Sequence, residues 1–389
     1  MTEPIPTVTL AATPPMGWNS WNMFGDRVTE ADVRETADTL ARLGLRELGY
    51  EYVVIDDCWS VKDGRDPDGN LVPNPLKFPA GIAALAEHVH SLGLKLGIYS
   101  DAADRTCAGY AGSHEFEEQD AALWASWGVD FLKYDYCNAP TDQPTAMDRY
   151  ARMGRALRGT GREILYSMCE WGGRHPHLWG ADVGAQMWRV TGDVFDSWVN
   201  VWMPTWGTYG IGVDVSLDAA ATLAPYGGPG RWNDLDMLVV GLRGKGQIHG
   251  TGMSQVEYQT HMSLWVMACS PLMIGCDLRA MDRDTAALLM NPEVLAVNQD
   301  VLGIPARRVR VQGRCETWAK PLADGSVAVA LINRDSTGQD MQLRAGDIGL
   351  LDTRKLVRDL WAQQDTADFG WGMALRVEPH ETRLLRVTP

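Results

Sequence analysis

The segment Phe131-Leu132-Lys133-Tyr134-Asp135 is the best starting point for predicting the fold of this chain. It is short and mostly apolar and is followed by polar residues, which is typical of a buried β-strand. Lys133 and Asp135 are two positions apart, so an extended backbone directs both side chains to the same face. Burying either charge is costly unless the charge is paired or used. We therefore predict that Asp135 is a catalytic nucleophile.

Similar short apolar runs recur from residue 15 to about residue 300, and helical patterns follow most of them. The predicted strands cover residues 16–18, 52–57, 94–100, 131–135, 164–169, 186–190, 237–240 and 272–275. The predicted helices cover residues 30–45, with Thr29 as the N-cap, and residues 82–91, 115–126, 146–157 and 255–268. The stretch 178–228 is less regular, and we assign no helix to it.

Eight strands that alternate with helices in one segment predict an α/β fold, a (β/α)8 TIM barrel. A doubly wound parallel sheet is the alternative, but it usually has a Gly-rich phosphate-binding turn after its first strand. This chain has Trp18-Asn19-Ser20-Trp21 at that place. The barrel is therefore favoured over the doubly wound sheet.

The character of the sequence changes near residue 302. Residues 326–331 and 382–387 alternate without a helical period, and turn residues separate such runs. This pattern predicts a small antiparallel β domain, a sandwich. We therefore expect a catalytic barrel at residues 1–302 and a C-terminal β domain at residues 303–389.

The overall charge limits which partners the protein can bind. A formal net charge of −15 argues against nucleic acid or an anionic membrane as the partner, because both need a basic face. No apolar run approaches the roughly 20 residues that span a bilayer. A neutral ligand fits better, and some of the 16 tryptophans are expected to stack on the C–H faces of sugar rings. The composition leaves the oligomeric state open, including a homo-oligomer.

The cysteines and the N-terminal residues bear on the location in the cell. Seven cysteines, an odd number in a long chain, do not resemble the disulfide framework of a small secreted protein. Residues 1–14 lack both the basic start and the apolar core of a signal peptide. We therefore expect a cytoplasmic protein.

The carboxyl ends of the predicted strands hold many acidic side chains. Active sites of (β/α)8 barrels lie at these ends. The candidate residues there are Trp21, Asp56, Asp57, Tyr99, Asp101, Lys133, Asp135, Cys169, Glu170, Trp171, Arg189, Asp193 and Asp236. One acid at a strand end is often a loop cap, but acids at six of eight ends indicate a shared site.

Metal binding is the first chemistry to consider for such a site. His88 and His90 form a His-x-His pair, but it lies inside a predicted helix rather than at a strand end. His175 and His177 lie in a loop, where solvation is the expected fate. An all-carboxylate Mg²⁺ site stays open from the residues alone, but it would leave Lys133 without a role because an ammonium group repels a cation. We expect no cofactor.

A reaction that uses two carboxylates accounts for these residues better. A retaining glycosidase needs one ionised carboxylate to attack C1 and one protonated acid to assist the leaving group, about 5–5.5 Å apart. Lys133 would keep Asp135 ionised. Asp193 follows Arg189 just past a predicted strand, where a loop can reach over the pocket. We predict that Asp193 is the acid.

These residues together resemble glycoside hydrolase family 27, the family of lysosomal and plant α-galactosidases. The resemblance runs from Pro14 to about Gly303 and weakly onward. It is carried by Met16-Gly17-Trp18-Asn19-Ser20-Trp21, Ile55-Asp56-Asp57-Cys58-Trp59, Gly97-Ile98-Tyr99-Ser100-Asp101, Lys133-Tyr134-Asp135-Tyr136-Cys137, Cys169-Glu170-Trp171 and Arg231-Trp232-Asn233-Asp234-Leu235-Asp236-Met237-Leu238. The order of these motifs makes the resemblance specific.

The resemblance implies roles for individual residues. Asp135 would be the nucleophile and Asp193 the acid/base. Asp56 and Asp57 would hold the 4- and 6-hydroxyls of galactose, and Trp21 would pack on the sugar. Further substrate contacts are implied at Tyr99, Cys107, Lys133, Cys137, Cys169, Glu170, Trp171, Arg189, Asp236 and Met237, and Cys107 and Cys137 would form a disulfide next to the site.

The resemblance also separates subtypes of the family. Members that accept N-acetylgalactosamine have small residues where this chain has Glu170-Trp171, so we expect a substrate with a free 2-hydroxyl. Members that prefer β-L-arabinopyranosides have a glutamate at the position of Asp56, so this aspartate favours galactose. Animal members bridge the cysteine at the position of Cys58, but this chain has Asp26 at the partner position, and Cys58 is expected to be a free, buried thiol.

The sequence therefore predicts an exo-acting, retaining α-galactosidase that acts on galactosides, as oligosaccharides or glycoconjugates. A β-L-arabinopyranosidase of the same family is the nearest alternative. A non-catalytic sugar-binding barrel is the alternative from another class, although both proposed catalytic carboxylates are present.

Overall fold

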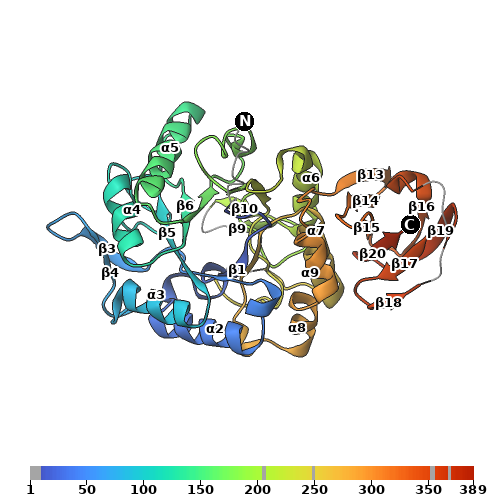
Figure 1. The fold of residues 1–389 in the computed structure, drawn as a ribbon, viewed down its shortest axis with the longest axis horizontal. Coiled ribbons are helices and arrows are strands. Elements are labelled where there is room, and N and C mark those ends of the chain that lie inside the picture. Colours follow the sequence, from blue (N-terminus) through green and yellow to red (C-terminus); the bar gives the residue numbers. More distant parts are fainter. Residues whose placement is uncertain (1–9, 204–206, 248–249, 351–354, 367–368) are drawn as a thin grey trace, which may run out of the picture.

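The computed structural model describes residues 10–203, 207–247, 250–350, 355–366 and 369–389, and its fold is shown in Figure 1. Residues 1–9 lie outside this part. They include most of residues 1–14, in which the sequence shows no signal-peptide pattern. A barrel surrounded by helices and a smaller β domain lie side by side along the long axis of the molecule (Figure 1). Among the described residues, no helix is long and apolar enough to cross a bilayer.

The barrel sheet has eight strands in the order β11-β8-β7-β6-β5-β2-β1-β12, and every pair of neighbours is parallel. The strands are β1 (Met16–Asn19), β2 (Tyr52–Val54), β5 (Lys95–Asp101), β6 (Phe131–Asp135), β7 (Leu165–Cys169), β8 (Met187–Arg189), β11 (Trp232–Asp234) and β12 (Leu272–Ile274). Leu238 closes the circle, because its N–H donates to Met273 and its carbonyl accepts from Gly275. The predicted barrel is confirmed.

One predicted strand was placed wrongly. Residues 237–240 do not form a strand, and the seventh strand of the barrel is instead β11. Asp236 has a φ of 81°, which breaks the extended backbone just before the apolar run, and its N–H is bonded by the Asp234 carboxylate at 2.8 Å. The apolar run from Met237 to Val240 is buried, so it reads as a strand in the sequence although it makes only one bridge to the sheet.

The predicted helices are confirmed within a few residues at each end. The structure has α1 (Trp21–Phe24), α2 (Glu30–Arg42), α3 (Gly81–Ser91), α4 (Glu117–Ser126), α5 (Gln143–Gly159), α6 (Val213–Leu223), α7 (Gln255–Met267), α8 (Arg283–Leu289) and α9 (Pro292–Asn298). Thr29 begins α2 with a capping box, in which its hydroxyl accepts from the N–H of Asp32 and the Asp32 carboxylate accepts from the N–H of Thr29. The prediction overran the end of α2 by three residues, because the chain turns after Arg42.

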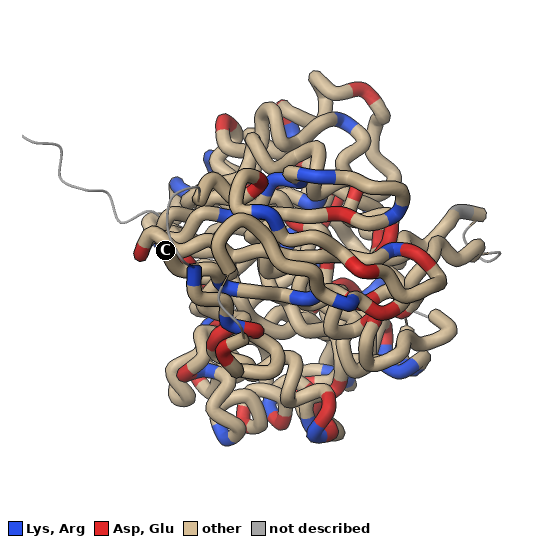
Figure 2. Tube along the Cα trace, turned by 90° about the vertical axis from the view of Figure 1, so that its right-hand side faces the viewer, with Lys and Arg blue, Asp and Glu red and all other residues tan. Residues whose placement is uncertain are grey.

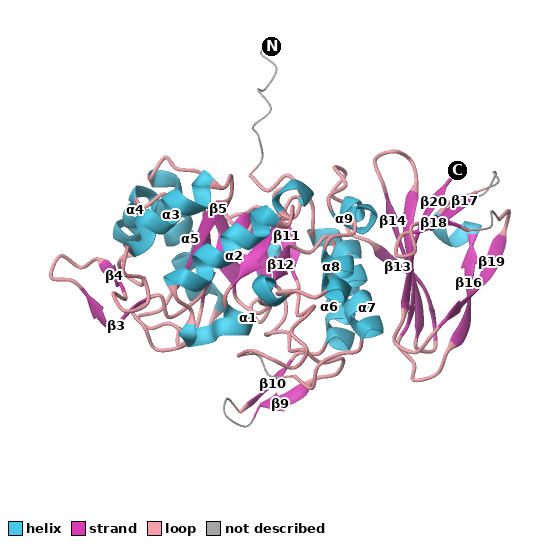
Figure 3. Ribbon diagram, turned by 90° about the horizontal axis from the view of Figure 1, so that it is seen from below, coloured by secondary structure: helices cyan, strands magenta, loops and turns pink. Residues whose placement is uncertain are grey.

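Two β-hairpins interrupt the alternation of strands and helices. The first consists of β3 (Ser60–Arg65) and β4 (Leu71–Pro73), and the second of β9 (Val201–Met203) and β10 (Thr208–Gly210). Figure 3 shows both hairpins extending outward from the barrel. The second hairpin lies in the stretch 178–228 that the sequence pattern left unassigned.

The C-terminal residues form an antiparallel β domain, as predicted. One sheet has the order β13-β14-β15-β20-β17-β18, and a second pairs β16 with β19. The strands are β13 (Arg307–Gln312), β14 (Cys315–Pro321), β15 (Val327–Asn333), β16 (Gln339–Arg344), β17 (Leu356–Asp359), β18 (Gln364–Asp365), β19 (Gly372–Val377) and β20 (Thr382–Thr388). Buried side chains of both sheets, among them Val329 and Leu343, share one core. Figure 2 shows acidic and basic residues interspersed on the side of the molecule where this domain lies.

Helix α7 joins the two parts of the molecule. It is buried on nearly every side, and Thr260 on it donates to the carbonyl of His380 at 2.6 Å. Trp361 of the β domain donates to Ser263 of the same helix at 2.9 Å. The expected boundary after residue 302 stays a prediction; the structure places the end of α9 at Asn298 and the start of β13 at Arg307.

Strand β1 packs so closely against β2 that adding one methyl group at Gly17 should destabilise the protein. A Cβ at Gly17 would lie 2.7 Å from the Cβ of Tyr52. We expect Gly17→Ala to lower the free energy of unfolding by roughly 1–3 kcal/mol, because the barrel backbone must shift. Gly159→Ala is the matched control, since that Cβ at the end of α5 meets nothing within 4 Å. Urea unfolding of both variants checks this, and an unchanged Gly17→Ala would contradict the register of β1.

Candidate active site

A cavity of about 730 Å³ opens at the carboxyl ends of the barrel strands. Many of the side chains that the sequence predicts for the site meet in it. They are Trp21, Asp56, Asp57, Tyr99, Cys107, Lys133, Asp135, Cys137, Trp171 and Asp193. The barrel thus collects residues that are more than 170 positions apart in the chain, because parallel strands present their carboxyl ends at one rim.

Lys133 and Asp56 form the first charged contact in the cavity. The Nζ atom of Lys133 lies 2.7 Å from Oδ2 of Asp56, and both side chains are nearly buried. Asn19 donates its Nδ2 to the same oxygen at 2.8 Å and accepts from the N–H of Trp21 at 2.8 Å. Burial lowers the pKa of Lys133, but the negative charges around it, that of Asp56 first, together outweigh burial, so the net pKa lies above the ordinary value. The ion pair with Asp56 therefore favours the charged form of Lys133.

Asp135, the last residue of β6, is a buried carboxylate on the cavity wall. Its residue exposure is 4%, the hydroxyl of Tyr99 donates to its Oδ2 at 3.0 Å, and the N–H of Tyr136 donates to its Oδ1 at 3.0 Å. Burial raises the pKa of Asp135 to about 6, although the charge of Lys133 lowers it. Lys133 thus favours the ionised form of Asp135, but its charge offsets only part of the effect of burial.

Arg189 joins Asp193 to Asp236 in a second charged cluster. Its Nη2 lies 3.0 Å from Oδ1 of Asp193, and its Nη1 lies 2.8 Å from Oδ1 of Asp236. The Asp236 side chain is 3% exposed, whereas the Asp193 side chain is 33% exposed. Burial raises the pKa of Asp236 to about 7, against the lowering by Arg189. Of the two carboxylates, Asp193 is the one that solvent and a ligand can reach.

Asp57 is held by main-chain donors beside Asp56. Its Oδ1 accepts from the N–H of Cys58 at 2.6 Å, and its Oδ2 accepts from the N–H of Ala108 at 3.0 Å. Burial raises its pKa. Cys58 is a free, buried thiol, as predicted, and burial raises its pKa to about 12. Asp26 also lines the cavity.

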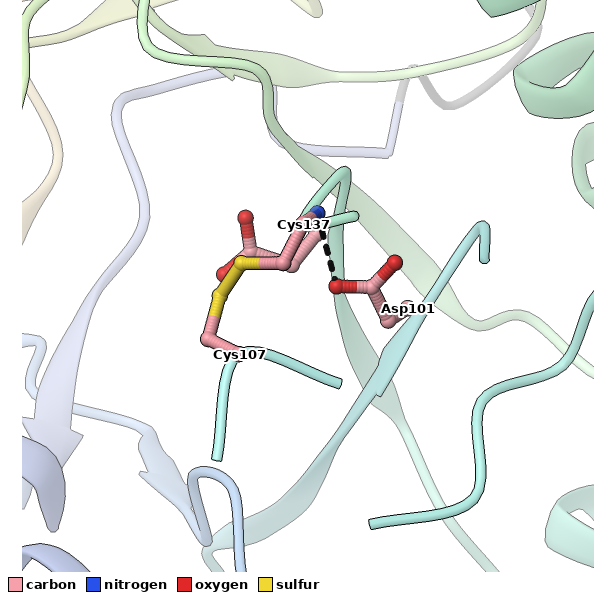
Figure 4. Close-up of side chains that lie close together, drawn as sticks. Asp101, Cys107 and Cys137 are labelled. Atoms are coloured by element: carbon pink, nitrogen blue, oxygen red, sulfur yellow. Dashed lines mark hydrogen bonds between the residues drawn. A yellow bond between two sulfur atoms is a disulfide. The ribbon is translucent and has the colours of Figure 1, made fainter. Parts of the chain in front are cut away.

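A disulfide joins Cys107 to Cys137 at the wall of the cavity. Figure 4 shows the bridge and the neighbouring Asp101, whose carboxylate accepts from the N–H of Cys137 at 2.9 Å. Asp101 also accepts from the N–H of Ala103 at 2.8 Å and is fully buried, so it organises the loop rather than facing the cavity. Asp101, Cys107, Asp135 and Cys137 are the one group of potential metal ligands that the described residues bring together, and the disulfide occupies both of its sulfur atoms.

The remaining predicted site residues do not line the large cavity. Arg189, Asp236 and Met237 line a narrow space of about 20 Å³ that also touches Lys133. Cys169 is fully buried 3.6 Å from Nη1 of Arg189. The carboxylate of Glu170 is buried against Arg174 at 2.6 Å, so within this pair only Trp171 reaches the cavity.

The histidine pairs contribute nothing to the site. The Nε2 atom of His88 lies 3.0 Å from Asp38, and that of His90 lies 2.7 Å from Asp130. These are separate surface contacts on α3. His175 and His177 contact each other by their rings, outside the set of residues that lines the cavity.

The backbone of the site is strained at strand ends. Cys58 after β2, Trp171 after β7 and Asp236 after β11 have φ values of 73°, 58° and 81°. Such left-handed conformations are uncommon for residues other than glycine and cluster at functional sites. Each of them turns the chain sharply just past a strand, which brings the following side chains over the rim.

Comparisons with known proteins agree with this geometry. Residues 13–300 match the family model described as Alpha galactosidase A, and residues 312–387 match the Alpha galactosidase C-terminal beta sandwich domain. The chain belongs to the α-galactosidase family. The predicted resemblance to glycoside hydrolase family 27 is thereby confirmed, and the chain is a glycoside hydrolase.

Individual members of the α-galactosidase family show how far the similarity extends. The α-galactosidase of Cyamopsis tetragonoloba is 44% identical over 98% of this chain and 87% of its own length. The crystal structure of α-galactosidase I from Mortierella vinacea superposes with a TM-score of 0.91, at 37% identity and 98% coverage of both chains. An α-galactosidase from Saccharomyces cerevisiae, solved with raffinose, has a TM-score of 0.90 at 30% identity, covering 98% of each chain.

A relative with the alternative specificity is less similar. The β-L-arabinopyranosidase of Geobacillus stearothermophilus, a member of the same family, has a TM-score of 0.82 at 28% identity, covering 97% of each chain. The fold therefore does not separate the two specificities by itself, and the residues around the sugar must do so.

Several side chains that line the cavity of this α-galactosidase family member were not predicted from the sequence. They are Asp26, Lys62, Tyr110, Phe195, Met203, Tyr209 and Gln247. Tyr209 lies on the hairpin β9–β10, and two short β-like runs separated by a few residues, 201–203 and 208–210, are the signal that could have revealed it. Asn19 was part of a quoted motif, but its bond to Asp56 needed the structure.

The disulfide predicts the number of free thiols in the family member. The chain has seven cysteines, and the bridge leaves five of them free. We expect the denatured, unreduced protein to release chromophore from a thiol-reactive disulfide reagent at five equivalents, and the reduced protein at seven. A Cys107→Ser variant is the control and should titrate six thiols after reduction. Seven thiols in the unreduced parent would contradict the bridge.

Proposed function

We propose that this chain is an exo-acting, retaining glycosidase that removes terminal α-D-galactosyl residues through a covalent galactosyl-enzyme. The observation that carries the proposal is one cavity holding two carboxylates of different environment, the buried Asp135 and the more exposed Asp193. A retaining reaction needs such a pair, one to attack and one to protonate. The α-galactosidase relatives support galactose as the sugar.

In the first step, an oxygen of Asp135 attacks C1 of the galactosyl unit. The bond between C1 and the glycosidic oxygen breaks, and the proton of Asp193 moves to that oxygen as the leaving group departs. Tyr99 and the N–H of Tyr136 hold the Asp135 carboxylate in place. The product of this step is an ester between C1 and Asp135, with the configuration at C1 inverted to β.

In the second step, Asp193 removes a proton from water, and the water oxygen attacks C1. The ester bond to Asp135 breaks, and galactose leaves with the α configuration restored. Arg189, 3.0 Å from Asp193, stabilises the ionised form that this step requires. Neither of the two displacement steps requires a cofactor.

Charged and polar groups near Asp135 would recognise the hydroxyls of the sugar. Asp56 and Lys133 form a donor and acceptor pair at the cavity wall, and Asp57 lies next to them. We propose that these groups bind the 4- and 6-hydroxyls, which favours a galactoside over an arabinoside that lacks the 6-hydroxymethyl group. Trp171 fills the cavity wall and favours a substrate with a free 2-hydroxyl.

Removal of each carboxylate tests the roles of Asp135 and Asp193. We expect Asp135→Ala to lower kcat/KM on nitrophenyl α-galactoside at least about a thousandfold, because the covalent step is lost. We expect Asp193→Ala to lower kcat/KM on an unactivated α-galactoside by a similar factor, because the leaving group is no longer protonated. With nitrophenyl α-galactoside, whose leaving group departs without a protonated acid, azide should restore turnover in both variants. It gives β-galactosyl azide with Asp135→Ala by direct attack, and α-galactosyl azide with Asp193→Ala through the intermediate. An active Asp135→Ala enzyme would show that β6 is structural and would sink the mechanism.

The pKa of Asp135 predicts an acid limb in the pH profile. Asp135 must be ionised to attack, so kcat/KM should fall as the pH drops through about 6, approaching tenfold per pH unit. Lys133 lowers this pKa, so Lys133→Met should move the limb to higher pH. Lys62→Met, which removes another cavity lysine, should leave the limb where it is. A limb that moves equally in both variants would contradict the assignment to Asp135.

The cytoplasmic location expected from the sequence stays a proposal. The disulfide between Cys107 and Cys137 opposes it, because cytoplasmic reductants keep thiols reduced. Titrating thiols in protein isolated from the cytoplasm under acid quench tests the location together with the bridge.

A further inference from the structure

The hairpin β9–β10 carries two exposed aromatic side chains beside the catalytic cavity. Trp202 and Tyr209 are directly paired across the hairpin, with ring centroids 4.9 Å apart at an interplanar angle of 63°. They are 50% and 57% exposed, unlike most of the large aromatic side chains, which are buried. Tyr209 lines the cavity, so the pair stands at its mouth.

The backbone holds this hairpin in a fixed position relative to Asp193. The N–H of Ile211, just after β10, donates to the carbonyl of Asp193 at 2.8 Å, and the N–H of Phe195 donates to the carbonyl of Ile211 at 2.9 Å. The ring of Phe195 packs on Gly210 so closely that a Cβ at this position would collide with it. The aromatic pair and the proposed acid/base are therefore parts of one short β-ladder.

The cavity changes in character from its interior to its mouth. The buried charges of Asp56, Lys133 and Asp135 gather on the strand ends, where the proposed function places the galactosyl unit. Phe195, Met203 and Tyr209 supply apolar surface on the side of the hairpin. The volume of about 730 Å³ lies within the range of about 300–1,000 Å³ for sites that enclose ligands of drug size, which is larger than one sugar ring.

The proposed reaction places the leaving group of the substrate near the hairpin. Asp193 protonates the glycosidic oxygen, so the group attached to that oxygen lies on the Asp193 side of the cavity. Exposed aromatic faces suit a ligand with one apolar and one hydroxylated side, and the C–H face of a pyranose or furanose ring is such a surface. A small alkyl leaving group would not reach from Asp193 to Trp202.

We propose that Trp202 and Tyr209 form a binding subsite for the leaving-group sugar of α-galactosyl oligosaccharides. The proposal rests on the proposed function, because it assigns the other half of the same substrate. The subsite binds the sugar attached directly to the scissile oxygen, or the next one along the chain. Its contribution appears only with substrates that carry such a sugar.

Two substrates with the same galactosyl unit separate the subsite from the catalytic centre. Raffinose has sucrose as its leaving group, whereas the leaving group of α-galactosyl fluoride is a fluoride ion, which contains no sugar and departs without prior protonation. For Trp202→Ala and for Tyr209→Ala, we expect the ratio of kcat/KM on raffinose to kcat/KM on the fluoride to fall about tenfold, which corresponds to about 1.4 kcal/mol. Trp202→Phe keeps a ring and should restore most of this ratio.

Trp371→Ala is the matched control, because Trp371 is 76% exposed but lies in the β domain. Its ratio should equal that of the parent. An unchanged ratio in both hairpin variants would overturn the subsite. This includes the case in which both substrates lose activity equally, which would mean that the hairpin only supports Asp193. A parent that hydrolyses neither substrate would instead contradict the proposed function, so the two failures are distinguishable.

Discussion

The buried ion pair between Lys133 and Asp56 is the interaction on which the rest of the site depends. Strand β5 lies between β2 and β6, so the lysine reaches over it, with Nζ 5.4 Å from the ring centre of Tyr99, and meets Asp56 at 2.7 Å. A charge buried without its partner costs about 3–5 kcal/mol. The strand order and the side chains of β2, β5 and β6 therefore have to agree, and Asn19 from β1 extends the same network.

The two charged clusters give the two proposed catalytic carboxylates different environments. Asp135 is enclosed, and its pKa near 6 reflects burial that Lys133 only partly offsets. Asp193 is bonded to Arg189 but is a third exposed, so water and a leaving group can approach it. Two groups of the same residue type can thus do different chemistry because one sits on a buried strand and the other on a loop at the rim.

The β domain supports this rim from outside the barrel. Trp198 follows Asp193 on the same loop, and its ring stacks on His380 of the β domain at 4.5 Å. His380 also lies 2.8 Å from Glu257 at the start of α7. Tyr258 of the same helix donates to Asp196 at 2.8 Å, and the N–H of Gly244 donates to Asp196 at 2.6 Å. The loop that carries Asp193 is therefore clamped between the hairpin, α7 and the β domain.

The sequence by itself determined the barrel, the C-terminal β domain and most of the strand-end residues, because burial patterns and strand-end chemistry are local. It placed β6 without error and found Lys133, Asp135 and Asp193. It failed for β11, where an apolar run past the strand gave the stronger signal, and for the hairpin β9–β10, whose short strands have little periodicity. Only the tertiary structure decided which charges meet, since the partners of Lys133 and Arg189 come from other strands or loops. The contacts of Glu170 were likewise undetermined, because its pairing with Arg174 depends on a sharp turn at Trp171 that no side-chain pattern encodes.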